Sequence, residues 1–96
     1  MKIPNCIPSI NSKELDYLKE CIKTKWLSST GPLVREFENK ISKFTGSKYA
    51  VALSSGTSAL QLAIKVLNPN YGDEVLMPSL SFIATANSII YNNCSP

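Results

Sequence analysis

The sequence contains no histidine, and this absence excludes several kinds of site from within the chain. Ser-His-Asp and Cys-His nucleophile systems need an imidazole, as do histidine-based metal sites. The three cysteines, Cys6, Cys21 and Cys94, are odd in number, widely spaced and without a CxxC pair. We therefore expect no metal site and no disulfide framework, and we predict reduced thiols in a cytoplasmic protein.

Long hydrophobic runs are also lacking. No window approaches the roughly 18 apolar residues of a membrane span, and the N-terminus has no apolar region of the signal-peptide kind. The 10 Lys and Arg against 7 Asp and Glu give a net charge of +3, with the lysines scattered rather than gathered into a stripe. We therefore expect neither a membrane nor a nucleic acid as a partner.

The composition is that of a globular protein. The 96 residues, 44% of them hydrophobic and 18% charged, are enough for one small domain or for a piece of a larger one. Asn11 is a favourable N-cap for a helix over residues 12–23, with Glu14 three positions later. Pro32 suits the first turn of a second helix, and Gly46 suits its C-terminal end.

The second half of the sequence alternates short apolar runs with helix formers. Residues 49–53 and 75–78 are predicted strands, and residues 58–67 form a helix that is apolar on almost every side and expected to be mostly buried. A further apolar segment covers residues 82–91. This order predicts an α/β protein with an open, parallel or mixed sheet flanked by helices.

The predicted sheet is incomplete. Typical sheets have about four to six strands, so two strands cannot bury helices on both faces. Residues 92–96 resemble a turn leading into another strand. We therefore interpret the chain as the N-terminal part of a longer protein, and a complete small α+β domain is the alternative.

The loop over residues 54–58 is the most informative segment for function. Small residues at the carboxyl end of a strand, opening directly into a helix, direct backbone N–H groups and the positive end of the helix dipole at one place. Such a loop can hold a phosphate, although Ser and Thr are also favoured as ordinary N-caps. The loop matches neither of the common glycine-rich phosphate motifs, so both interpretations stay open.

Five other residues are candidates for a site. Phe82 follows the second strand and could stack on a flat cofactor ring or lie in the core. Trp26, the only tryptophan, lies in a polar loop and suits either the rim of a pocket or helix packing. Asp73 and Glu74 are most simply a solvated turn, and Lys65 is most simply a surface residue.

Several motifs in order resemble the DegT/DnrJ/EryC1/StrS family of pyridoxal-phosphate-dependent sugar aminotransferases. The resemblance covers nearly the whole chain, from about Ile7 to Pro96, and several spaced motifs are more specific than any one. The matching segments are Trp26-Leu27-Ser28-Ser29-Thr30-Gly31-Pro32 with Val34 and Phe37-Glu38, Gly46 with Tyr49-Ala50-Val51-Ala52, Ser54-Ser55-Gly56-Thr57-Ser58-Ala59-Leu60, Gly72-Asp73-Glu74-Val75, Pro78-Ser79 and Phe82-Ile83-Ala84-Thr85-Ala86-Asn87.

The resemblance implies the N-terminal portion of the large domain of an aspartate-aminotransferase-type (fold type I) enzyme. Residues 1–31 would be an arm, a helix and a loop, and residues 32–96 the start of the cofactor-binding domain. In that family the Ser-Gly-Thr loop binds the cofactor phosphate, which assigns this role to Gly56, Thr57 and Ser58. The family's aromatic that stacks on the pyridine ring corresponds to Phe82, although Ser81 stands where the family commonly has Thr.

The resemblance also implies substrates and partners. Trp26 and Ser28 would lie near the nucleotide-sugar site, and the whole protein would be a homodimer. It would transfer an amino group, from glutamate, to a nucleotide-linked keto-deoxysugar for polysaccharide or glycan synthesis.

The family's Schiff-base lysine lies beyond this chain, so no catalytic residue is assigned and the chain alone is expected to be inactive. A sugar 3-dehydratase of the same family and a non-catalytic binding or dimerisation module are the alternatives.

Overall fold

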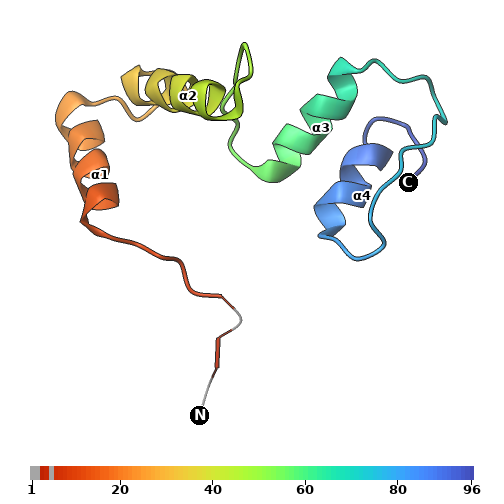
Figure 1. Cartoon of the computed structure of the whole chain (residues 1–96), viewed down its shortest axis with the longest axis horizontal. Helices are drawn as coiled ribbons and strands as arrows, with labels where there is room; N and C mark the ends of the chain where they lie inside the picture. The colour runs from red at the N-terminus through yellow and green to blue at the C-terminus, as the bar shows by residue number, and fades with distance from the viewer. Residues whose placement is uncertain (1–2, 5) are drawn as a thin grey trace. The chain divides into compact units, whose positions relative to one another are not determined.

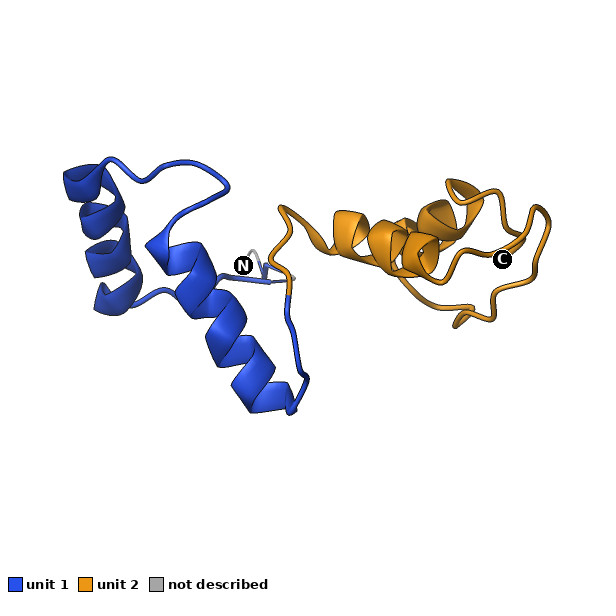
Figure 2. Ribbon diagram, turned by 90° about the horizontal axis from the view of Figure 1, so that it is seen from above, with its two compact units in different colours: residues 1–50 blue, residues 51–96 orange. Residues whose placement is uncertain are grey.

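The structure, a computed structural model, describes residues 3–4 and 6–96 of the chain (Figure 1). Its internal contacts divide the chain into two units, residues 1–50 and residues 51–96 (Figure 2). Two helices, α1 and α2, belong to the first unit, and α3 and α4 belong to the second. The predicted boundary after residue 31 concerns the domains of a whole protein and stays a prediction.

The helix α1 spans Ser12–Thr24 and begins with the predicted capping box. The Asn11 side chain accepts a hydrogen bond from the Lys13 N–H at 2.9 Å, and the Asn11 N–H donates to Glu14 Oε2 at 2.9 Å. Two of the N–H groups that a helix start leaves unsatisfied are thereby paired. The predicted start and the end within one residue of Lys23 are confirmed.

The helix α2 spans Pro32–Thr45, and the residues that bound it are those expected. Pro32 occupies the first turn, where its missing N–H is not needed. Gly46 adopts a left-handed conformation with φ of 72°, which a residue without a Cβ reaches at little energetic cost.

The second unit contains α3, Gly56–Val66, and α4, Ile83–Ile90, which pack against each other. Ser55 caps α3, because its side chain accepts a hydrogen bond from the Ser58 N–H at 3.2 Å. The observed helix begins two residues before the predicted one, at Gly56. Within the part of the chain that the structure describes, no helix has the length and apolar character needed to cross a membrane.

Two polar side chains join α4 to the backbone of α3. Ser88 Oγ contacts the Thr57 carbonyl oxygen at 3.4 Å, and Asn92 Nδ2 donates to the Gln61 carbonyl at 3.0 Å. The donors are four residues apart and so are the acceptors, in the same order along the chain. The two helices therefore run in the same direction and start at the same end of the pair, as Figure 1 also shows.

The predicted sheet is not formed among the described residues, which contain one isolated parallel β-bridge between Glu74 and Ser95. The Val75 N–H donates to the Ser95 carbonyl at 2.9 Å, and the Ser95 N–H donates to the Asp73 carbonyl at 2.8 Å. Strands need neighbouring strands, and residues 49–53 find none in the described chain. The bridge joins the predicted second strand to the segment expected to lead into another.

The prediction that the third helix is mostly buried is wrong for this structure. No residue of α3 is buried, and Val66 and Leu67 are 74% and 80% exposed. A helix that is apolar all round is buried only where other elements cover each side, and within the second unit only α4 packs against it. The buried residues among those described are Ser88, Ile89 and Cys94.

Replacing Ile89 is expected to destabilise the fold more than replacing its neighbour. Ile89 is 1% exposed and Ile90 is 54% exposed, so only Ile89→Ala leaves a cavity. We expect Ile89→Ala to lower the free energy of unfolding by about 2–4 kcal/mol, and Ile90→Ala by clearly less. Chemical denaturation of both variants measures the difference, and equal losses would contradict the packing described here.

Removing the cap of α3 is expected to weaken that helix. Ser55→Ala leaves the Ser58 N–H without its acceptor, and such a loss typically lowers stability by about 1 kcal/mol. Ser54→Ala is the matched control, because Ser54 is exposed and precedes the cap. Thermal or denaturant unfolding should separate the two variants, and a loss for Ser54→Ala as large as that for Ser55→Ala would argue against this cap.

Candidate functional site

The first turn of α3 carries the residues predicted to bind phosphate. The Ser58 N–H donates to Ser55 Oγ, and the Ser58 and Ser55 hydroxyls lie 3.0 Å apart. The N–H groups of Gly56 and Thr57 form no hydrogen bond within the described part of the chain, as is usual in a first helical turn. The ordinary cap is therefore present, and it leaves two backbone donors available to an anion.

The space beside Gly56 is open. Apart from its two chain neighbours and the backbone of its own helix, a Cβ added to Gly56 would meet no atom within 4 Å. An anion can therefore approach the start of α3, where the positive end of the helix dipole favours negative charge. The geometry and electrostatics of this turn fit a phosphate group.

Phe82 immediately precedes α4 and is 87% exposed. The alternative that Phe82 is a core aromatic does not hold in this structure. A hydroxyl contact of 2.9 Å between Ser81 and Thr85 bridges the segment around it, and the Thr85 N–H donates to the Phe82 carbonyl at 3.0 Å. The ring is thus carried at the start of a helix with its faces accessible.

The structure brings the predicted phosphate turn and Phe82 to the same end of one helix pair. Phe82 lies six residues before Ser88, and Gly56 lies one residue before Thr57, the residue that Ser88 contacts. At about 1.5 Å per helical residue, Phe82 extends roughly 8 Å beyond Gly56 along the common direction. This offset is on the scale of a pyridine ring that carries a phosphate-bearing substituent.

Trp26 and Ser28, the predicted substrate contacts, lie in the loop between α1 and α2 in the first unit. Both line a pocket of about 270 Å³ together with Leu18 and Cys21 of α1. The Ser28 hydroxyl donates to the Thr30 carbonyl at 2.7 Å and so closes a local turn. The Trp26 ring lies against Gly31, where an added Cβ would be 3.4 Å from the ring.

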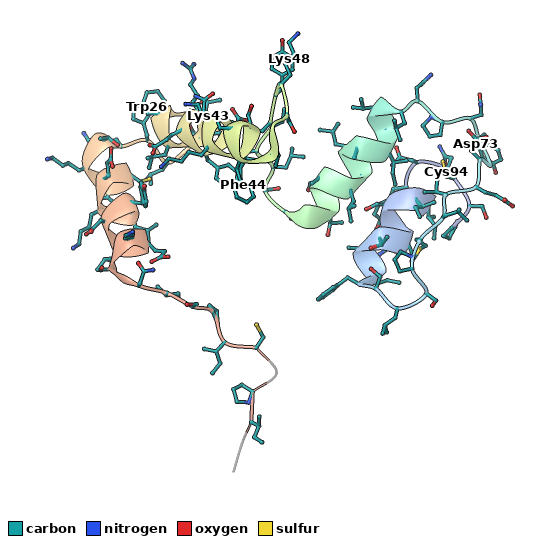
Figure 3. The ribbon with its side chains drawn as sticks, in the orientation of Figure 1. Trp26, Lys43, Phe44, Lys48, Asp73 and Cys94 are labelled. Carbon is teal, nitrogen blue, oxygen red and sulfur yellow. The ribbon has the colours of Figure 1, made fainter. Side chains whose placement is uncertain are left out.

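Trp26 also borders a larger hollow of about 670 Å³. Figure 3 shows the side chains of Trp26 and Lys43, two of its lining residues, along α2. The lining of the hollow includes Arg35, Lys40 and Lys43 against the single acid Glu36. Glu36 is paired with Lys40, their charged atoms 2.5 Å apart, and this hydrogen bond raises the Lys40 pKa. Arg35 and Lys43 give the hollow a positive balance, but both are exposed side chains screened by solvent.

The remaining candidates behave as the simpler interpretations predicted. The Asp73 carboxylate accepts a hydrogen bond from the Asn70 N–H at 2.7 Å and closes an exposed turn through Gly72. Lys65 is exposed in the last turn of α3. Among residues 3–4 and 6–96, no group of three or more acidic, Cys or His side chains could hold a metal ion.

Sequence reasoning did not identify Ser88 and Asn92, which join α4 to α3. Ser88 is fully buried, and both side chains reach backbone carbonyls of the neighbouring helix. The available signal was their spacing of four residues, which places two polar side chains on one face if the helical turn continues past Ile90. That spacing shows a shared face but not the acceptors that the face meets.

Comparisons with known proteins agree on one family. Residues 8–96 match the DegT/DnrJ/EryC1/StrS aminotransferase family. The chain is 41% identical over 95 residues to GDP-perosamine synthase of Caulobacter vibrioides, covering 99% of this chain and 26% of that protein. It is 42% identical over 94 residues to GDP-perosamine synthase of Escherichia coli O157:H7, covering 98% and 26%. The chain thus spans about a quarter of the length of these relatives.

The structure also resembles a solved one. A crystal structure of a doubly substituted ColD superposes with a TM-score of 0.81 at 26% identity, over 92% of this chain and 24% of that one. This likeness and the family match support the predicted origin in a fold type I enzyme, while the sheet itself is not formed in the described residues. From the match over residues 8–96, the chain belongs to the DegT/DnrJ/EryC1/StrS aminotransferase family.

Proposed function

We propose that the protein containing this chain is a pyridoxal-phosphate-dependent aminotransferase that acts on a nucleotide-linked keto-deoxysugar, with glutamate as the amino donor. The observation that carries the proposal is the common end of α3 and α4, where two available backbone donors and an exposed aromatic ring lie together. Membership of the aminotransferase family and relatives named GDP-perosamine synthase support the reaction and the class of substrate.

The first turn of α3 would hold the cofactor phosphate. Gly56 and Thr57 would donate backbone N–H groups, and the hydroxyls of Thr57 and Ser58 would add side-chain donors. The Ser58 N–H is engaged by Ser55, so its contribution is expected to come through the hydroxyl. The helix dipole adds a fixed positive potential at the same place.

Phe82 would cover one face of the pyridine ring. An aromatic side chain stacks on a flat ring and limits the approach of water on that side. When bound, pyridoxal phosphate supplies the electron sink for amino transfer, and the chain's own part is to bind and orient it. The remaining groups that the reaction needs are not assigned to residues of this chain.

The other parts of the proposal rest on the family. Trp26 and Ser28 are proposed contacts of the nucleotide-sugar, supported by their shared pocket. A homodimer, a cytoplasmic location and a role in polysaccharide or glycan synthesis are proposed for the whole protein. One further relative, the Bacillus subtilis spore coat polysaccharide biosynthesis protein SpsC, is 40% identical over 94 residues.

A carboxylate placed at Gly56 is expected to prevent phosphate binding without unfolding the protein. The added side chain meets open space, and an acidic residue in a first helical turn is favourable. We expect Gly56→Asp to weaken pyridoxal phosphate binding by at least about tenfold, because two negative charges would lie within a few ångströms. The measurement is the dissociation constant in the protein expressed from its complete reading frame.

Gly56→Asn is the matched control for Gly56→Asp. It adds nearly the same volume without the charge and should weaken binding much less. Equal effects of the two variants, or no effect of either, would contradict a phosphate at this turn. The free energy of unfolding of both variants shows whether the fold is retained.

The reaction itself is tested by incubating the purified protein with pyridoxal phosphate, glutamate and nucleotide-linked keto-deoxysugars. Mass spectrometry should detect an amino-sugar product. We expect Trp26→Ala to raise KM for the sugar about two- to tenfold, whereas Phe44→Ala, an exposed aromatic in the same unit, should not. Loss of a hydroxyl without gain of nitrogen would indicate the sugar dehydratase instead, and no turnover would contradict both.

A further inference from the structure

Ser88 of α4 and Asn92, in the turn that follows α4, each contact the backbone of α3 and the backbone of their own segment. Ser88 Oγ donates to the Ala84 carbonyl of its own helix at 2.7 Å and contacts the Thr57 carbonyl at 3.4 Å. Asn92 Nδ2 donates to the Ser88 carbonyl at 2.8 Å and to the Gln61 carbonyl at 3.0 Å. Ser88 has no exposed surface, so water does not compete for its hydrogen bonds.

One of these contacts involves Thr57, a residue of the proposed phosphate-binding turn. Thr57 is one of the two residues whose N–H groups are available at the start of α3. Its carbonyl oxygen lies 3.4 Å from Ser88 Oγ, so this contact relates a position along α3 to a position on α4. Phe82 is carried by the start of that same helix.

Sliding α3 by one residue relative to α4 would break both contacts together. The acceptors Thr57 and Gln61 are one helical turn apart, as are the donors Ser88 and Asn92, so the contacts act as a two-point register. In another register Ser88 and Asn92 would keep their partners in their own segment, at Ala84 and Ser88, but both contacts with α3 would be lost, which makes alternative registers less favourable.

We propose, resting on the proposed cofactor site, that Ser88 and Asn92 are positioning residues that set the offset between the phosphate-binding turn of α3 and Phe82. They touch neither phosphate nor ring. We expect them to affect only a ligand that contacts the phosphate-binding turn and Phe82 at the same time. Such a ligand gains affinity only when these two contacts are held at the right separation.

This distinction defines the experiment. The protein expressed from its complete reading frame is titrated, by equilibrium dialysis, with pyridoxal phosphate, with pyridoxal and with inorganic phosphate. Only pyridoxal phosphate has both a phosphate for the turn of α3 and a ring for Phe82. The variants are Ser88→Ala and Asn92→Asp, and the second replaces both amide donors by carboxylate oxygens at nearly constant volume. Ser95→Ala, an exposed serine in the same unit, is the control.

We expect each variant to weaken pyridoxal phosphate binding about threefold to tenfold, the effect of one hydrogen bond. Binding of pyridoxal and of inorganic phosphate should change less than twofold, as should every affinity of the Ser95→Ala control. If all three ligands weaken equally, or if none does, Ser88 and Asn92 are merely structural and the proposal is overturned.

Failure of the two proposals can be told apart. If the unaltered protein does not bind pyridoxal phosphate, the proposed cofactor site is wrong, and the positioning role falls with it. If the unaltered protein binds but the variants bind equally well, only the positioning role is wrong. Should Ser88→Ala fail to fold, Asn92→Asp decides the matter, because Asn92 is only partly buried.

Discussion

The packing of α4 on α3 is the interaction on which the second unit depends. It contains the fully buried Ser88 and sets the direction of both helices through contacts with backbone carbonyls. Because the helices are parallel, their positive dipole ends lie at the same end of the pair, offset by roughly 8 Å. The packing of these two helices therefore places the phosphate-binding turn and Phe82 of the proposed site at the same end of the pair.

The parts of the fold that local chemistry determines could be predicted from the sequence. Asn11, Pro32 and Gly46 fix helix ends through hydrogen bonds and backbone preferences that need no distant partner, and the structure confirms these ends within a residue or two. Local chemistry could not show whether the strands predicted at residues 49–53 and 75–78 would form. A strand is stable only beside another, so its formation depends on pairing that a local pattern does not reveal.

The same reasoning separates what could and could not be predicted of the site. The turn at Gly56–Ser58 and the aromatic Phe82 each carry a local signal, although choosing between phosphate binding and an ordinary cap needed the family motifs. That the two lie at one end of a helix pair follows from Ser88 and Asn92, whose acceptors lie 31 residues away in the chain. No local pattern encodes such a separation.

The bridge between Glu74 and Ser95 has a consequence for handling the isolated chain. Beyond this bridge the segment at Leu76, whose side chain is fully exposed, presents backbone donors and acceptors beside apolar surface. Unpaired backbone groups of this kind can form hydrogen bonds with an extended segment of another chain, including a second copy of this one. The isolated 96-residue polypeptide is therefore expected to self-associate as its concentration rises.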